Sequence, residues 1–332
     1  MSNMQSLLRL RERLFGNRQT LLSYWQDIAE NFFPQAAEFT VARTSGEEFV
    51  SNLTTSYPIL AHSDLSNTLG SMLRPKDRTW FHIKASRPER VDHEGNMWLE
   101  WATATQRRAM YDRMAGFNRA TKQGDRDYAA FGNAVISVEL NSDRSRFLYR
   151  NWHLRDCAWA EGADCHISHF ARDWKPTAHQ LKQTFGSKVH KDIDDAIRTG
   201  EPFKEFKCVH MVIPSDGKYR QPWRSVHIDL GNEHVMEDVG SWGRIYVVPR
   251  WQTVATSPYA HSPSVVAALP DARLIQAISL TLLDAGEMYA APPMLAVHNA
   301  IRGDIDLRAR GITWVDAEYD ERLGEVLRPL NQ

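Results

Sequence analysis

The stretch that decides the fold runs from residue 263 to residue 290 and reads PSVVAALPDARLIQAISLTLLDAGEMYA. Its apolar residues recur at helical spacing, and Ser262-Pro263 supplies an N-cap followed by a proline at the first helical position. We expect one long helix that Pro270 kinks or restarts and that Pro292-Pro293 ends. Its predicted apolar stripe consists of Val265, Val266, Leu269, Ala272, Ile275, Ile278, Leu282, Ala285 and Met288. A second, polar face carries Arg273, Gln276, Asp284 and Glu287.

Amphipathicity alone leaves two interpretations of this helix. It is either a core helix of a globular domain or a helix that packs against copies of itself in a ring. We expect no membrane-spanning segment, because a span needs about 20 apolar residues and Pro270 and several charged residues interrupt this stretch. Residues 1–13 alternate apolar and charged side chains, so no signal peptide is expected either.

Helices are predicted for the first part of the chain, over residues 5–131. The first begins a heptad spacing at Leu7 that continues to Ile28, and Pro34 ends it. Further helices are expected at residues 58–73, 94–114 and 118–131, the last closed by Gly132. Between them, Trp80 to Lys84 alternates like a short strand.

From residue 133 to residue 251 the apolar period changes to two, which is typical of β-strands. Turn signals such as Pro214-Ser215-Asp216-Gly217 separate successive strand candidates. Two short helices interrupt the series, one opened by Pro176-Thr177 and closed by Gly186, the other over residues 191–198. The expected fold class is therefore α+β.

Charge and composition limit the classes of function that the chain can have. Lys and Arg number 40 and Asp and Glu 41 among 332 residues, so the formal net charge is −1. A protein that binds duplex DNA tightly usually has an excess of basic residues. The near-zero net charge is compatible with a passage through which DNA only slides. Eleven tryptophans favour a large assembly surface. Three cysteines form no disulfide framework and indicate synthesis in a reducing cytoplasm.

Signatures of catalysis are scarce. The sequence has no Walker phosphate loop, no dinucleotide glycine fingerprint, no His-Glu-x-x-His and no Gly-x-Ser-x-Gly. A nuclease-like acid site would use Asp192, Asp194 and Asp195, but Lys188 and Lys191 favour a solvated, charge-paired helix face. A zinc site would use ligands whose spacing fits no standard pattern, namely His153, Cys157, Cys165, His166, His169 and His210. We therefore expect no catalytic residue, metal or cofactor.

Landmarks spread over the whole chain occur in an order that resembles one protein family. They include the Tyr24-Trp25 and Phe33-Pro34 pairs and the helix-to-strand junction from Ala129 to Val135. The chain resembles the portal, or head-to-tail connecting, proteins of short-tailed, T7-like tailed bacteriophages. The landmark residues are Trp25, Pro34, Trp80, Phe81, Gly132, Arg172, Thr177, Gln180, Gly186, Arg250, Trp251, Tyr259, Pro263, Pro292 and Pro293.

The resemblance implies a portal fold made of a wing, a stem and a clip. Residues 1–251 would form the wing, with helices over 5–131 and a β-rich part over 133–251. Residues 252–291 would be a linker and the first stem helix, and residues 292–332 the start of a small α/β clip. Family members usually continue beyond the equivalent of Gln332, so we expect the crown to be absent from this chain.

The resemblance also implies a function without catalysis. The chain would form a homo-oligomeric ring, a dodecamer, at the portal vertex of the virion capsid, after assembly in the host cytoplasm. Double-stranded DNA would pass through the ring without sequence-specific binding, and the partners would be capsid and scaffolding proteins, the terminase motor and a tail adaptor, with no membrane. Residues Arg273, Gln276, Leu282, Asp284 and Glu287 would face a neighbour or the channel, and Arg302, Arg308 and Arg310 would contact a partner of the clip.

Two alternatives stay open from the residues alone. One is a metal-dependent nuclease or hydrolase that uses the acid or Cys/His clusters. The other is an adaptor protein of a virion, which would not need a long helix that leads through a proline pair into an exposed lobe.

Overall fold

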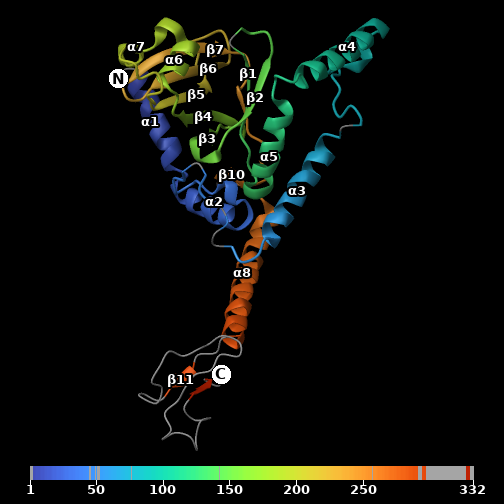
Figure 1. Ribbon diagram of the computed structural model, residues 1–332. Helices are drawn as coiled ribbons and strands as arrows, with labels where there is room; N and C mark the ends of the chain where they lie inside the picture. The colour runs from blue at the N-terminus through green and yellow to red at the C-terminus, as the bar shows by residue number, and fades with distance from the viewer. Residues whose placement is uncertain are drawn as a thin grey trace, which may run out of the picture. The chain divides into compact units, whose positions relative to one another are not determined.

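The computed structural model describes residues 3–290, except 45, 49, 51, 52, 76, 142 and 256, together with the backbone of 294–296 and 327–329. The chain divides into two compact units, Met1–Ala272 and Arg273–Gln332. Within the described residues it has eight α-helices, and its strands form antiparallel sheets, so the predicted α+β class is confirmed (Figure 1).

The first predicted helix is two helices, α1 (Asn3–Gly16) and α2 (Gln19–Phe32). Between them Arg18 is 2% exposed, and its guanidinium donates hydrogen bonds to the carbonyl oxygens of Leu154, at 3.0 Å, and Arg155. These buried bonds with a distant loop fix the chain at the break, which the heptad spacing does not reveal. Pro34 starts the 3-10 turn Pro34–Ala36 directly after α2.

Three further helices belong to the larger unit: α3 (Tyr57–Leu73), α4 (His93–Met110) and α5 (Phe117–Phe131). Helices α3 and α5 lie side by side. Asp92 caps α4 by accepting a hydrogen bond from the backbone N–H of Gly95 at 2.8 Å. Figure 1 shows α4 standing away from the sheets of the same unit.

The predicted strand at Trp80–Lys84 is wrong. The segment is extended but pairs with none of the strands that the structure describes. Instead, the backbone N–H of Ile83 donates to the hydroxyl of Thr103 on α4 at 3.0 Å, and Trp80 Nε1 donates to the hydroxyl of Tyr111 at 3.0 Å. A helix side chain thus replaces the ladder partner that an alternating segment would otherwise need.

The strands of the larger unit form two antiparallel sheets of more than two strands and one strand pair. A five-stranded antiparallel sheet is formed, in spatial order, by β3 (Cys157–Glu161), β4 (Ile167–Trp174), β5 (Cys208–Pro214), β6 (Trp223–Asp229) and β7 (His234–Ser241). A three-stranded sheet has the order β2 (Phe147–Asn151), β1 (Ile136–Leu140) and β8 (Tyr246–Val247). Strands β9 (Gln252–Val254) and β10 (Ser257–His261) pair with each other, as do β11 (Met294–Ala296) and β12 (Leu327–Pro329).

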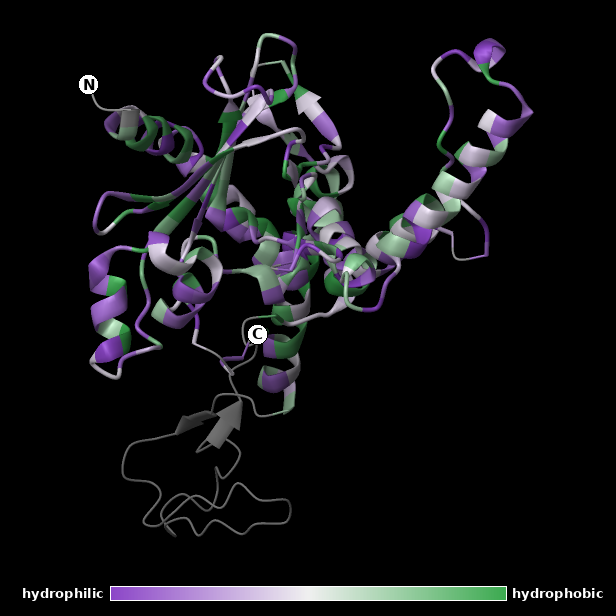
Figure 2. Ribbon diagram, turned by 90° about the horizontal axis from the view of Figure 1, so that it is seen from above, coloured by the Kyte–Doolittle hydropathy of each residue, from purple (hydrophilic) through white to green (hydrophobic). Residues whose placement is uncertain are grey.

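Both faces of the five-stranded sheet are covered. Leu7 and Leu14 of α1 pack with Val209 and Met211 of β5 on one face, while Phe170 and Val212 belong to the cluster built around α2. Helices α6 (Ala178–Phe185) and α7 (Lys191–Arg198) lie between β4 and β5 in sequence and bury one end of the sheet. Figure 2 shows the hydrophobic colouring concentrated on the strands and the inner helix faces.

A buried polar network joins the two larger sheets. The guanidinium of Arg172 in β4 lies 3.7 Å from the ring centre of Trp152 and donates through Nε to the hydroxyl of Tyr246 at 2.8 Å. The same hydroxyl lies 2.6 Å from Nδ1 of His210. Burial lowers the pKa of His210, with further contributions from His227 and Arg172, so that ring stays neutral.

Asp127 on α5 supports a prediction about pH. Its Oδ2 accepts a hydrogen bond from Asn151 Nδ2 at 2.6 Å, and burial raises its pKa to about 7. Because the pKa of the folded state exceeds that of the unfolded chain, this group costs stability as the pH rises from about 4 through about 7. We expect Asp127→Asn to unfold with a free energy about 2–4 kcal/mol above the parent at pH 8 and near the parent value at pH 4. Urea titrations at both pH values test this, and a pH-independent difference would contradict it.

Candidate functional site: helix α8 and the junction at its base

The long predicted helix is present as α8 (Pro263–Ala290) and runs through Pro270 without ending. Ser262 is 2% exposed, and its hydroxyl accepts a hydrogen bond from the N–H of Val265 at 3.5 Å. Proline removes one helical hydrogen bond, and here the loss is mild because both Pro270 and Val266 are exposed, so the carbonyl that loses its partner can reach water.

The predicted single stripe of α8 consists of two separate faces. Val265, Leu269 and Ala272 are buried in the core cluster of the larger unit, together with Trp25 of α2. At about 100° per residue, Ile278 lies about 120–180° and Leu282 about 80–140° from those side chains around the helix axis. Their exposed fractions are 49% and 67%. The first turns of α8 therefore anchor the helix, and the remainder presents a different apolar face.

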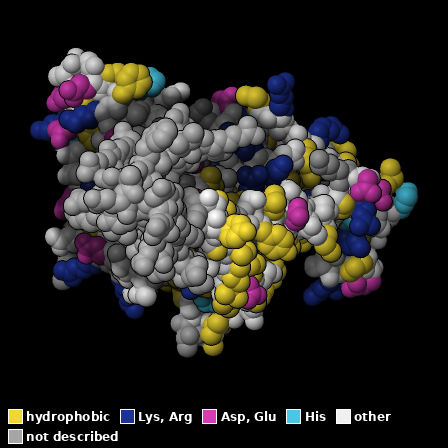
Figure 3. Space-filling view, turned by 60° about the horizontal axis from the view of Figure 1, so that its bottom comes forward, with side chains coloured by type: hydrophobic (Ala, Val, Ile, Leu, Met, Phe, Trp, Pro, Cys, Tyr) yellow, Lys and Arg dark blue, Asp and Glu magenta, His cyan; other side chains and the backbone are white. Residues whose placement is uncertain are grey.

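Beyond Ala272 the surface of α8 is strongly apolar. Seven large apolar side chains of the described stretch are about half exposed or more: Leu274, Ile278, Leu280, Leu282, Leu283, Met288 and Tyr289. Figure 3 shows hydrophobic side chains gathered in a band on this side of the molecule, with few charged side chains among them. An exposed apolar surface of this extent marks a contact site, since isolated soluble chains rarely leave one uncovered.

The polar side chains of this stretch share the other face. Arg273, Gln276, Asp284 and Glu287 follow one another at helical spacing, as predicted, with Leu280 among them. The carboxylates of Asp284 and Glu287 lie on exposed residues. Helix α8 thus offers an apolar face for packing and a polar face for contact with water or a charged surface.

The expectation that no segment could cross a membrane needs correction. Among the described residues, α8 is long and apolar enough to do so by length and composition alone. Pro270 and the charged residues do not rule out a membrane-spanning length. Pro270 does not end the helix, and the second half of the helix carries only two acidic residues.

The junction at the base of α8 is built around Gly132 and Asn133. Gly132 has a φ of 70° and ends α5 in the left-handed conformation, as its place in the sequence predicts. A Cβ added there would lie 2.2 Å from the carbonyl carbon of His261 and 2.5 Å from the backbone nitrogen of Ser262. The Asn133 side chain donates to the carbonyl of Ala260 at 2.7 Å and accepts from the N–H of the same residue at 2.9 Å. The end of α5 and the start of α8 are thus locked together.

Aromatic landmarks surround this junction. Tyr259 is buried, and its ring lies 5.9 Å from Trp25 and 4.5 Å from Trp159 between ring centres. Trp251 stacks on Tyr128 at 5.2 Å. The backbone N–H of Trp251 donates to the carbonyl of Gly132 at 2.8 Å. The structure therefore brings Trp25, Gly132, Trp251, Tyr259 and Pro263 together at the base of α8.

Other landmark residues have local structural positions. Thr177 and Gln180 form a capping box at the start of α6, and Gly186 ends that helix with a φ of 61°. Arg250 donates to the carboxylate of Glu161 and to the carbonyl of Pro258. Trp80 and Phe81 contact each other at 4.8 Å beside α4, and Arg172 belongs to the buried network. Pro292, Pro293, Arg302, Arg308 and Arg310 lie outside the described residues.

The candidate chemical clusters do not assemble. Across the part of the chain that the structure describes, no three His, Cys, Asp or Glu side chains are placed to hold a metal ion. Cys157 is buried and Cys165 exposed, and burial raises the pKa of the Cys157 thiol. The acids of α7 pair separately: Asp194 with Lys182 at 2.7 Å, Asp195 with Arg198 at 3.4 Å and Asp192 with His190 at 3.5 Å. These partners differ from the expected Lys188 and Lys191, but the charge-paired face is as predicted.

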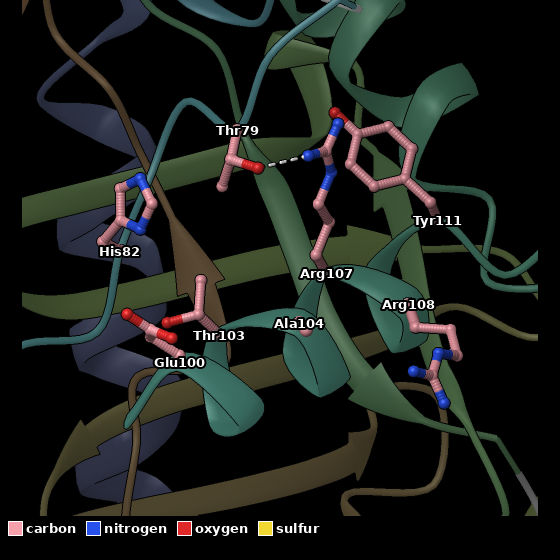
Figure 4. A pocket seen from close by; sticks show the side chains of 8 residues that line it. All are labelled: Thr79, His82, Glu100, Thr103, Ala104, Arg107, Arg108 and Tyr111. Atoms are coloured by element: carbon pink, nitrogen blue, oxygen red, sulfur yellow. Dashed lines mark hydrogen bonds between the residues drawn. The ribbon is translucent and has the colours of Figure 1, made fainter. Parts of the chain in front are cut away.

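One surface was not predicted from the sequence. Met97, Trp98 and Trp101 of α4 have exposed fractions of 59%, 60% and 61%, and the two indole rings lie 6.4 Å apart. The opposite side of the helix holds the segment before it, as Figure 4 shows, where the guanidinium of Arg107 donates to the hydroxyl of Thr79 at 2.6 Å. Apolar residues at helical spacing signalled a helix here, but nothing in the spacing distinguishes a covered face from an open one.

Comparison with known proteins gives the family. The family described as "Bacteriophage head to tail connecting protein" matches residues 4–332. The chain is similar to the "Probable portal protein" of Bordetella phage BPP-1, with 23% identity over 316 residues. That match covers 92% of this chain and 56% of the relative, so the chain spans little more than half of the relative's length. The chain belongs to the bacteriophage head to tail connecting proteins, a non-enzymatic family.

Proposed function

We propose that copies of this chain pack through α8 into a closed ring around a channel, and that the ring serves as the portal of a phage capsid. The observation that carries the proposal is the apolar face of α8 beyond Ala272, which the described part of its own chain leaves exposed. Membership of a head-to-tail connecting family supports a role at the junction between head and tail. Because this family is non-enzymatic, membership excludes the alternative of a nuclease or hydrolase.

Ring closure follows from the two faces of the helix. A heterologous contact, in which one face of a subunit packs against a different face of the next, generates a ring when the rotation closes. The apolar residues Leu274, Ile278 and Leu282 would be desolvated between neighbours, which stabilises the contact by about 25 cal/mol for each Å² of apolar surface buried. The polar face with Arg273, Asp284 and Glu287 would then stay in water at a channel or rim.

The near-neutral charge suits a passage for DNA. Tight binding of duplex DNA requires many neutralised phosphates, and each one would have to be released again as the duplex moves. A chain with 40 basic and 41 acidic residues provides no general excess of positive charge. We therefore propose that double-stranded DNA passes during packaging and ejection without sequence-specific binding.

The finer assignments are also proposals. Residues 1–251 would form the wing, 252–291 the linker and first stem helix, and 292–332 the start of the clip. The ring would be a dodecamer of the T7-like type, bound to capsid and scaffolding proteins, then to the terminase motor and later to a tail adaptor. The base of α8 supports the boundary between wing and stem, because Gly132 and Asn133 fix the helix to the wing.

A membrane-spanning role is the second candidate, favoured by the length and composition of α8. The two candidates predict different behaviour of the full chain in buffer without detergent. A portal stays in solution with the mass of a large oligomer by multi-angle light scattering, and does not float with liposomes in a density gradient. Flotation with liposomes, or recovery only in detergent, would contradict the portal proposal.

We expect Arg308→Glu to leave the assembled ring intact and to weaken docking of the motor or the tail. Arg308 belongs to the proposed clip, and reversing its charge would repel an acidic partner surface. Packaging of DNA into empty capsids and tail attachment, each measured with the variant ring, test this assignment. Unchanged packaging and unchanged tail attachment would contradict it.

A further inference from the structure

A groove lined by arginine lies between the start of α5 and strand β2. It has a volume of about 540 Å³, and Arg113, Arg119 and Arg150 stand around it. Its apolar lining comes from Met114, Leu148, Tyr149 and Trp152, of which Met114 is 65% exposed. Among the described residues, those that line it include no Asp or Glu. We call this surface the arginine groove.

The three guanidinium groups lack carboxylate partners in the part of the chain that the structure describes. Within the described residues, no ion pair includes Arg113, Arg119 or Arg150. All three residues are exposed, and the guanidinium of Arg150 lies 5.9 Å from the ring centre of Trp152. Like charges around one groove repel each other, so an acidic surface with apolar side chains would be attracted to it.

The tip of α4 has the complementary composition. Between residues 87 and 101 there are four acids, Glu89, Asp92, Glu94 and Glu100, against two arginines. In the described part of the chain no ion pair includes any of the four acids. Glu94, Trp98 and Trp101 share one helix face, because they are four and three residues apart. We call residues 87–101 the arm tip.

We propose that the arm tip of one copy docks in the arginine groove of a second copy of this chain. The match has two parts: exposed indoles face an apolar floor, and carboxylates face guanidinium groups, neither of which takes part in an ion pair among the described residues. The tip and the groove are different surfaces of one chain, which is the arrangement that a closed ring requires. The inference rests on the proposed ring and names the wing contact that would hold neighbours together in addition to α8.

A second copy fits the groove better than a nucleic acid does. Duplex DNA presents regularly spaced phosphates and gains little from half-buried Leu148, Tyr149 and Trp152. The exposed Trp98 and Trp101 also need an apolar surface, and aromatic and arginine side chains are the types enriched where proteins contact each other. One contact would cover both surfaces.

Charge exchange tests the docking. We expect Glu89→Lys/Glu94→Lys and Arg119→Glu/Arg150→Glu each to raise the protein concentration needed for ring assembly by about tenfold or more. Combining all four substitutions restores opposite charges across the contact and should return that concentration to within about threefold of the parent value. Mass photometry over a dilution series measures the fraction of chains in rings. Assembly of both double variants at the parent concentration, or no recovery in the combination, would overturn the inference.

Controls separate folding from docking. Arg220→Glu and Trp242→Ala change an exposed arginine and a tryptophan that is 68% exposed, both outside the arm tip and the groove, and should assemble like the parent. Thermal unfolding reports whether each variant is folded. If a charge variant fails to fold, Trp98→Ala/Trp101→Ala replaces it, because those exposed side chains are not part of the core. Normal rings from that pair would overturn the inference.

The outcomes also distinguish the inference from the function it rests on. If the parent forms rings and every arm-tip and groove variant does too, the docking is wrong and the ring proposal survives. If the parent forms no oligomer at any concentration, both fall. If Arg119→Glu/Arg150→Glu keeps its rings but loses retention of duplex DNA in a gel-shift assay, the groove serves nucleic acid and the docking is overturned.

Discussion

The Leu282→Asp variant is expected to fold normally and to form no rings. Leu282 is 67% exposed in the single chain, so a carboxylate there meets water and leaves the fold unchanged. In a ring the same carboxylate would be taken out of water against apolar neighbours, which costs about 3–5 kcal/mol at each contact. The cost recurs at every subunit contact around the ring. Circular dichroism should match the parent, and light scattering should give the mass of a single chain.

Leu280→Asp is the matched control on the same helix. Leu280 is 50% exposed and lies four residues from both Gln276 and Asp284, on the polar face. A carboxylate at this position should stay in water, so Leu280→Asp should assemble into rings. Rings from Leu282→Asp, or equal loss of rings in both variants, would show that the apolar face of α8 is not the subunit contact.

The Gly132→Ala variant is expected to lose most of its stability. Two penalties add at this position. A non-glycine residue at a φ of 70° costs about 1–2 kcal/mol, and the new Cβ would lie 2.2–2.5 Å from the backbone of His261 and Ser262. The neighbouring atoms are backbone, held by the Asn133 hydrogen bonds to Ala260, so they cannot move without opening the base of α8. We expect a loss of more than about 4 kcal/mol.

Gly200→Ala provides the comparison for Gly132→Ala. Gly200 also has a positive φ, 84°, but its Cβ position is open, with no atom within 4 Å among the described residues. That substitution should cost only about 1 kcal/mol, the backbone part of the penalty. Urea unfolding of both variants separates backbone strain from the clash. A similar small loss in both would show that the α5–α8 junction can relax.

The sequence was most informative where local chemistry decides the structure. Helix α8 begins at Pro263 as predicted, Gly132 closes α5, and Thr177 and Gly186 bound α6, because caps and left-handed glycines act within a few residues. Contacts between residues far apart in the sequence determine the features that were not predicted. The heptad spacing could not show that Arg18 breaks the first helix by reaching Leu154, nor that Thr103 satisfies the backbone of residue 83 in place of a strand.

The candidate site was predictable only in part. The apolar and polar faces of α8 were visible in the sequence, but which turns are buried depends on the core around Trp25, and this divides the predicted stripe in two. The arm tip and the arginine groove were not predicted, because exposure of Trp98 and proximity of Arg119 to Arg150 arise only in the folded chain. Periodicity reports that a helix has a face, and the fold determines what that face meets.

Electron microscopy of the purified full chain, negatively stained in detergent-free buffer at micromolar concentration, tests the central claim most directly. The account predicts ring-shaped particles with a central opening, seen end-on, and their absence from the Leu282→Asp sample. A field of small compact particles without an opening, at concentrations where light scattering also gives the mass of one or two chains, would contradict it.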